Sequence, residues 1–82
     1  MPRASLDPIE RDLRIQVMRA IRQQMLNRKM TPIDAAELLG VARTNVSWVV
    51  NLHAERVSLS QLLAWARKLG LDITIDIDVT AI

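Results

Sequence analysis

Apolar residues recur at helical spacing through the first third of the chain. One series repeats every four positions, with two further apolar residues beside it: Ile9, Leu13, Val17, Ile21 and Met25, flanked by Met18 and Leu26. The series predicts a long amphipathic helix that ends near Arg28 or Lys29. Asp7 and Pro8 suit the cap and the first position of that helix. Its arginines fall mostly off the apolar series and are expected in solvent: Arg11, Arg14, Arg19 and Arg22.

Residues 31–50 predict two short helices joined by a tight turn. Thr31-Pro32-Ile33-Asp34 is typical of a helix start, and Gly40 can adopt the positive φ that ends this helix after Leu39. A further helix is expected from about Arg43 to Asn51, although Ala42 cannot cap it. The small Ala36 would let the two helices cross closely, with a shared core of Val41, Val46 and Val49 (or Val50). This combination is typical of the helix-turn-helix unit, which places its second helix in the DNA major groove.

The pattern changes from helical to alternating near the carboxyl end. Ser58-Leu59-Ser60-Gln61 predicts a capping box for a fourth helix that ends at Gly70 and buries Leu62, Leu63, Ala66 and Leu69. Residues 71–79 alternate strictly between apolar and polar, which predicts a half-buried β-strand. A lone strand leaves backbone groups without partners, so we expect it to pair with its copy in a second chain. The pairing face would carry Ile73, Ile75, Ile77 and Val79; a strand that docks alone or binds another partner is the alternative.

Length and composition fit one small helical domain spanning residues 1–82, with helices at about 8–70. The chain has 82 residues, of which 50% are hydrophobic. It has no cysteine, which excludes disulfides and thiolate metal sites. No apolar stretch approaches the roughly 20 residues of a membrane helix. We therefore expect a cytoplasmic, nucleoid-associated protein without a membrane partner.

Charge is distributed unevenly along the chain. All 11 Lys and Arg residues lie in positions 1–68 with six acids, which gives this part a net charge of +5. Residues 69–82 contain three acids and no base. The helical part therefore favours a polyanionic partner such as DNA, although a solvated surface of mixed charge would give the same count.

The second helix of the helix-turn-helix unit carries the candidate DNA contacts. Its early polar residues, and the tryptophan after them, are Arg43, Thr44, Asn45, Ser47 and Trp48. Arg43 suits two hydrogen bonds to guanine and Asn45 two to adenine. Lys29 and Thr31 are placed for contacts with the DNA backbone. Trp48 has three interpretations: an exposed residue, a DNA contact, or packing against residues 51–57 or a second subunit.

The sequence gives little support for a metal site or for catalytic chemistry. His53 is the only histidine, and no ligand cluster surrounds it in the sequence. Asp72, Asp76 and Asp78 share one strand face, where a solvated acidic edge is favoured over a cation site. No nucleophile–base arrangement and no phosphate-binding loop occur, so the sequence indicates neither an enzyme, nor a cofactor, nor a metal.

The order of these features resembles the Xre (Cro-like phage repressor) helix-turn-helix family, especially its branch of HigA-like antitoxins. The resemblance covers residues 13–79. Its carriers are AAELLGV at 35–41, Val46-Ser47, Val57-Ser58-Leu59 and LGLDITIDI at 69–77. The chain departs from many relatives at Pro32, where they have glutamine, at Ala42, where they have Ser or Thr, and at Trp48, where they have arginine. They also tend to have a glycine-containing turn near Asn51-Leu52.

The resemblance implies a mainly α, λ-repressor-like bundle of four to five helices with a C-terminal β-strand, paired across a dimer. It also implies a homodimer that binds an operator in double-stranded DNA and represses its own operon, often while neutralising a toxin. DNA contact carries over to Arg43, Thr44, Asn45 and Ser47, with Thr31 on the backbone. We therefore expect a sequence-specific repressor, the antitoxin of a toxin–antitoxin operon. The alternative is a protein-interaction antitoxin whose DNA binding is secondary or lost.

Overall fold

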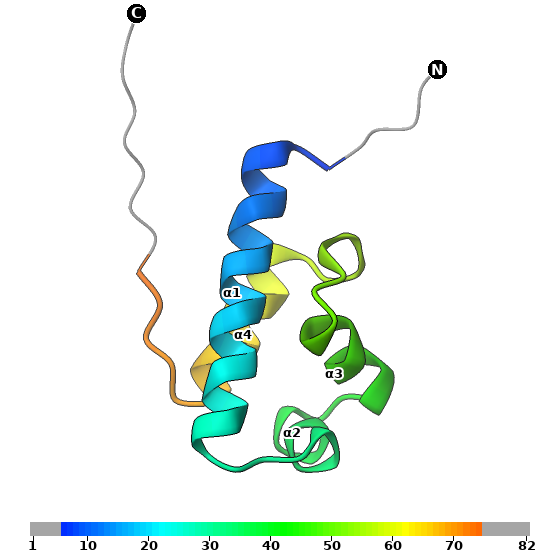
Figure 1. Cartoon of the computed structure of the whole chain (residues 1–82), viewed down its shortest axis with the longest axis vertical. Coiled ribbons are helices and arrows are strands. Elements are labelled where there is room, and N and C mark those ends of the chain that lie inside the picture. The colour runs from blue at the N-terminus through cyan, green and yellow to red at the C-terminus, as the bar shows by residue number, and fades with distance from the viewer. Residues whose placement is uncertain (1–5, 75–82) are drawn as a thin grey trace, which may run out of the picture.

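The computed structural model describes residues 6–74, which form four α-helices and one short 3-10 helix (Figure 1). In chain order these are α1 (Pro8–Asn27), α2 (Pro32–Leu39), α3 (Arg43–Val50), η1 (Ala54–Arg56) and α4 (Leu59–Lys68). The long α1 packs against α4, α3 and η1, while α2 packs mainly on α3. The mainly helical bundle and its four predicted helices are confirmed in this part of the chain.

Helix α1 begins where the sequence predicts and faces the core with its apolar series, but only part of that series is buried. The Asp7 carboxylate accepts hydrogen bonds from the backbone N–H groups of Ile9 and Glu10, both at 3.1 Å. Four residues of the helix are buried: Val17, Met18, Ile21 and Met25. Ile9 and Leu26, near the two ends of the apolar stripe, are 73% and 66% exposed. Helix α1 has 20 residues and α4 has 10, and the partner helix is too short to cover both ends.

One hydrophobic core joins all four helices. Its fully buried large side chains are Met18, Ile21, Val49, Leu62 and Leu69. Trp65 is 4% exposed and belongs to this core. The core fixes α3 against α1, so the orientation of α3 is set by packing and not by the turn alone.

Four basic side chains hold elements of the bundle together, and two of them correct an expectation. Their donors reach backbone carbonyl oxygens in the pairs Arg14–Ala54, Arg22–Val50 and Arg28–Leu69, each at 3.0 Å, and Lys68–Leu39 at 3.3 Å. Three of these carbonyls lie at the C-terminal ends of α2, α3 and α4, where carbonyls lack intrahelical partners and cations are stabilising. Arg14 and Arg22 are therefore half-buried structural residues, although the sequence predicted solvated positions for both.

The segment after α4 (residues 71–74) lies along the bundle without regular secondary structure. Gly70 has a φ of +85° and turns the chain back, and the Leu71 N–H donates to the Ala66 carbonyl at 2.9 Å. Leu71 and Ile73 are half-buried on the chain's own core, while Asp72 and Thr74 are exposed, so the predicted alternation is present. Residues 71–74 do not form the predicted strand, because the described residues offer no neighbouring strand for its ladder. Ile75, Ile77 and Val79 lie outside the described residues.

Candidate nucleic-acid interface

Helices α2 and α3 meet through a three-residue turn of defined geometry. Gly40 has φ 71° and ψ 35°, the left-handed conformation that ends α2. The Val41 N–H then donates to the Ala36 carbonyl at 3.0 Å, and Ala42 is extended and precedes the first residue of α3. Ala36, Val46 and Val49 are buried where the two helices cross, and Val41 and Val50 pack on their edge. The predicted helix-turn-helix unit is present.

Helix α3 has two opposed faces. Val46 and Val49 are each 2% exposed and face the core. Arg43, Thr44 and Ser47 lie on the opposite face and are exposed, as predicted for residues that contact a duplex. No side chain caps the helix N-terminus at Ala42, so nothing from its own cap covers the end of α3. The exposed end is a favourable approach for an anionic ligand.

Asn45 does not belong to this exposed face. It is half-buried and lines a groove between α3 and α4 together with Gln61 and Ser58. The residue lies about 160° around the helix from Ser47, since each helical residue advances about 100°. Asn45 therefore lies off the face that carries Arg43, Thr44 and Ser47, and its predicted contact with adenine stays a prediction.

Trp48 lies at the edge of the exposed face and packs within the same chain. Its side chain is half-buried, and the guanidinium carbon of Arg56 lies 5.9 Å from the ring centroid. The distance is within the range of a cation–π interaction. Of the interpretations open from the sequence, packing against residues 51–57 is the one observed.

Two residues of this surface were missed by sequence reasoning. Asn51 follows Ser47 by one turn, and its side-chain amide donates to the Ser47 carbonyl at 2.9 Å and to the Ser47 hydroxyl at 3.1 Å. The four-residue spacing between Ser47 and Asn51 could have identified it. Arg56 lies in η1, and no local pattern places it beside α3, because its position depends on how the chain returns after Leu52.

The start of α2 is occupied by a reciprocal capping pair. The Thr31 hydroxyl accepts from the Asp34 N–H at 3.1 Å, and the Asp34 carboxylate accepts from the Thr31 N–H at 3.0 Å. These contacts lower the pKa of Asp34, first through the Thr31 backbone N–H and then through its side chain. Thr31 is exposed, but its hydroxyl contacts both the backbone N–H and the carboxylate of Asp34. The Asp34 charge beside it weakens the predicted backbone contact.

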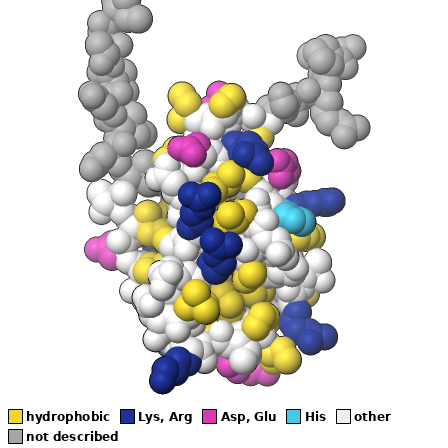
Figure 2. Space-filling view, viewed as in Figure 1, with side chains coloured by type: hydrophobic (Ala, Val, Ile, Leu, Met, Phe, Trp, Pro, Cys, Tyr) yellow, Lys and Arg dark blue, Asp and Glu magenta, His cyan; other side chains and the backbone are white. Residues whose placement is uncertain are grey.

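Lys29 and the basic residues of α1 extend the positive charge. Lys29 is exposed at a φ of 55° in the turn between α1 and α2. Figure 2 shows Lys and Arg side chains along the face formed by α1, with acidic side chains both near the upper end of α1 and at the lower edge, where α2 lies. Arg11 is exposed and pairs with Glu55 at 3.2 Å. The Glu55 N–H and then Arg11 lower the pKa of the Glu55 carboxyl.

Residues 6–74 contain no group of three or more His, Cys, Asp or Glu side chains that could hold a metal ion, and His53 is exposed. No helix in that part of the chain is long and apolar enough to cross a membrane.

The family model of the helix-turn-helix domain matches residues 5–78, nearly the whole chain. The chain belongs to the helix-turn-helix domain family. Membership indicates a DNA-binding regulator, in agreement with the turn and the two-faced α3. No curated protein and no solved structure matches the chain.

Proposed function

We propose that this helix-turn-helix protein is a sequence-specific transcriptional repressor. Helix α3 enters the major groove with its exposed face, and the bound protein blocks access to a promoter. The observation that carries this proposal is the division of α3 into a face of Arg43, Thr44 and Ser47 in solvent and a face of Val46 and Val49 in the core. Arg43 suits guanine, whose O6 and N7 accept two hydrogen bonds from one guanidinium.

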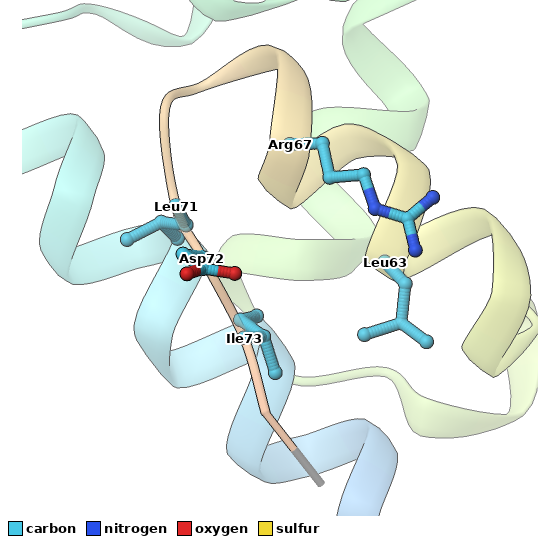
Figure 3. Close-up of a pocket in the computed structure, with 5 residues that line it drawn as sticks. All are labelled: Leu63, Arg67, Leu71, Asp72 and Ile73. Atoms are coloured by element: carbon cyan, nitrogen blue, oxygen red, sulfur yellow. The ribbon is translucent and has the colours of Figure 1, made fainter.

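The repressor acts as a homodimer in this proposal, with the C-terminal segments of two copies side by side. A groove of about 290 Å³ supports the arrangement: Leu63 and Arg67 on α4 lie across it from Leu71, Asp72 and Ile73 (Figure 3). Its apolar side chains come from both walls, and Arg67 adds a positive charge that suits the acidic sequence of a second copy's C-terminal residues. A two-fold pair would present its α3 helices to half-sites about 34–36 Å apart.

The protein is further proposed to repress its own operon, with a toxin gene beside its own gene. This step rests on the resemblance to HigA-like antitoxins within the Xre family, carried by AAELLGV at 35–41 and LGLDITIDI at 69–77. Binding of the purified protein to its own upstream DNA, and not to an unrelated promoter, is the expected result. Equal binding to both fragments would contradict autoregulation.

Substitution of Arg43 tests the DNA-binding role. Arg43→Ala is expected to weaken binding by about 1–3 kcal/mol and to relax base preference at one position of the site. Arg19→Ala is the matched control, because it removes the same charge from an exposed position on α1, outside the helix-turn-helix unit, and should leave base preference unchanged. Titration of duplexes with single base changes measures both effects. An equal loss on every sequence, or no loss, would contradict base contact by Arg43.

A second candidate function is binding and silencing of a basic toxin protein, and the exposed face of α2 favours it. That face carries Ile33 and Leu38, 49% and 43% exposed, interleaved with the acids Asp34 and Glu37. Apolar area combined with negative charge suits a basic protein surface better than DNA. Glu37→Lys should then weaken capture of the protein encoded beside this gene while operator binding persists. Unchanged capture would contradict this role for α2.

A further inference from the structure

Trp48 and Arg56 form a pair beside the exposed face of α3. Trp48 follows Thr44 by one helical turn, so its ring borders the residues proposed to contact bases. The ring is half-buried, and the Arg56 guanidinium carbon lies 5.9 Å from its centroid. Arg56 is exposed and comes from η1, eight positions further along the chain. The pair therefore extends the surface of α3 toward α4.

The indole ring is a poor base-reading group in this position. Its single N–H is a donor without an accompanying acceptor, so it cannot form the two-bond patterns that distinguish bases. Arg56 also lies over one face of the ring, which leaves less of that face for a partner. Arg56, in contrast, has five N–H donors in a planar fork that matches phosphate oxygens.

The surroundings of Arg56 leave its charge available to an anion. It lines an open groove of about 350 Å³ together with Trp48, Asn45, Ser58 and Gln61, and no lining residue is acidic. The adjacent Glu55 pairs with Arg11 and not with Arg56. The groove also reaches the N-terminus of the ten-residue α4, whose partial positive charge acts in the same direction.

We propose that Trp48 is a positioning residue that holds the Arg56 guanidinium beside α3 to bind one phosphate of the DNA backbone. Stacking on the ring orders the long arginine side chain before DNA arrives, which reduces the entropy lost on binding. Trp48 then contributes to affinity without contacting a base. This inference rests on the proposed function, entry of α3 into the major groove, and adds a contact at the flank of that site.

Salt dependence of DNA binding tests the proposal. The probe is a duplex recovered by in vitro selection from random-sequence DNA with the full-length protein. Removal of one phosphate-binding side chain reduces the slope of log affinity against log salt by about 0.9. We expect this reduction in Arg56→Ala, with about tenfold weaker binding at low salt. Trp48→Ala should weaken binding with a smaller change of slope because Arg56 is still present, Trp48→Phe should restore most of the affinity, and the double variant should be no weaker than Arg56→Ala alone.

The results separate this inference from the function on which it rests. If the wild-type protein selects no preferred sequence, the repressor proposal fails and this contact fails with it. If the wild type is selective and Arg43→Ala relaxes that selectivity, but Arg56→Ala leaves slope and affinity unchanged, only the phosphate contact is overturned. A changed base preference in Trp48→Phe would instead make the ring a base contact and would overturn its positioning role.

A measurement without DNA checks the stacking itself. The ring current of Trp48 should shift the side-chain proton signals of Arg56 in the free protein. Trp48→Phe should keep a smaller shift and Trp48→Ala should abolish it. Arg56 signals at the positions of an unstructured arginine in the wild type would overturn the proposed positioning, whatever the DNA result.

Discussion

Replacement of Gly40 by alanine should destabilise the protein through backbone strain alone. Gly40 ends α2 at a φ of +71°, in the left-handed region that L side chains rarely occupy. A Cβ built at this position meets no atom within 4 Å, so steric contact with neighbours adds nothing. A loss of stability in Gly40→Ala would therefore report on the backbone conformation of the turn that connects α2 to α3.

The expected loss of stability is the difference between two opposing free-energy contributions. A non-glycine residue in the left-handed conformation costs about 1–2 kcal/mol. Alanine also restricts the unfolded chain, which returns about 0.4–1 kcal/mol. The net destabilisation is about 1 kcal/mol, which lowers Tm by about 4–8 °C in a domain of this size.

Thermal unfolding followed by circular dichroism measures this difference. Gly40→Asn is the matched variant, because asparagine tolerates the left-handed conformation better than alanine does, and it should lose less stability. A Tm equal to or above that of the wild type in Gly40→Ala would refute the left-handed turn. The relation between α2 and α3 on which the DNA interface depends would then need another explanation.

Three further predictions concern the charges and the carboxyl end. Asp34→Asn should lower Tm at neutral pH, because contacts with Thr31 depress the pKa of the Asp34 carboxyl below its ordinary 3.8 in the folded state. The stabilisation from a depressed pKa is present above 3.8 and is lost as pH falls through the folded value, so the two melting curves should converge in acid; a constant gap would contradict the charged cap. Arg22→Ala should cost about 1–2 kcal/mol in chemical denaturation because the Val50 carbonyl at the end of α3 loses its donor, whereas exposed Arg19→Ala should be near neutral; equal effects would argue against this bond. Ile75→Asp should convert the proposed dimer to monomers or aggregates in sedimentation, whereas Thr74→Asp, on the exposed side of the alternation, should leave it intact; an unchanged dimer in Ile75→Asp would refute pairing through this face.

Local signals in the sequence predicted much of the fold. Asp7, Thr31 and Ser58 each accept a hydrogen bond from a backbone N–H at the start of the helix that they were expected to begin. Gly40 and Gly70 adopt the positive φ expected where α2 and α4 end. These features depend on a few neighbouring residues, so a pattern in the chain is sufficient to identify them.

Features that depend on distant contacts were harder to predict. Arg22 has the same periodic position as a solvent-facing arginine, and only the approach of α3 gives it a carbonyl partner. Lys29 and Leu52 adopt a positive φ without being glycine, at 55° and 58°. Leu52 thus takes the turn conformation for which the resembled family tends to use glycine. Nothing in the local sequence marks that conformation.

The residues of the candidate site also fall into those that local sequence patterns predict and those that depend on tertiary contacts. The exposure of Arg43, Thr44 and Ser47 follows from helical periodicity once the valines are assigned to the core. The stacking of Arg56 on Trp48 and the turn of Asn45 toward α4 require the tertiary arrangement.

Amide chemical shifts of the labelled protein, recorded while a selected duplex is added, test the central claim most directly. We predict that the largest changes fall at residues 43–47, at the exposed end of α3, with smaller ones at Thr31 and Arg56. Changes concentrated on the far side of α1 and α4, with residues 43–47 unaffected, would contradict the entry of α3 into DNA.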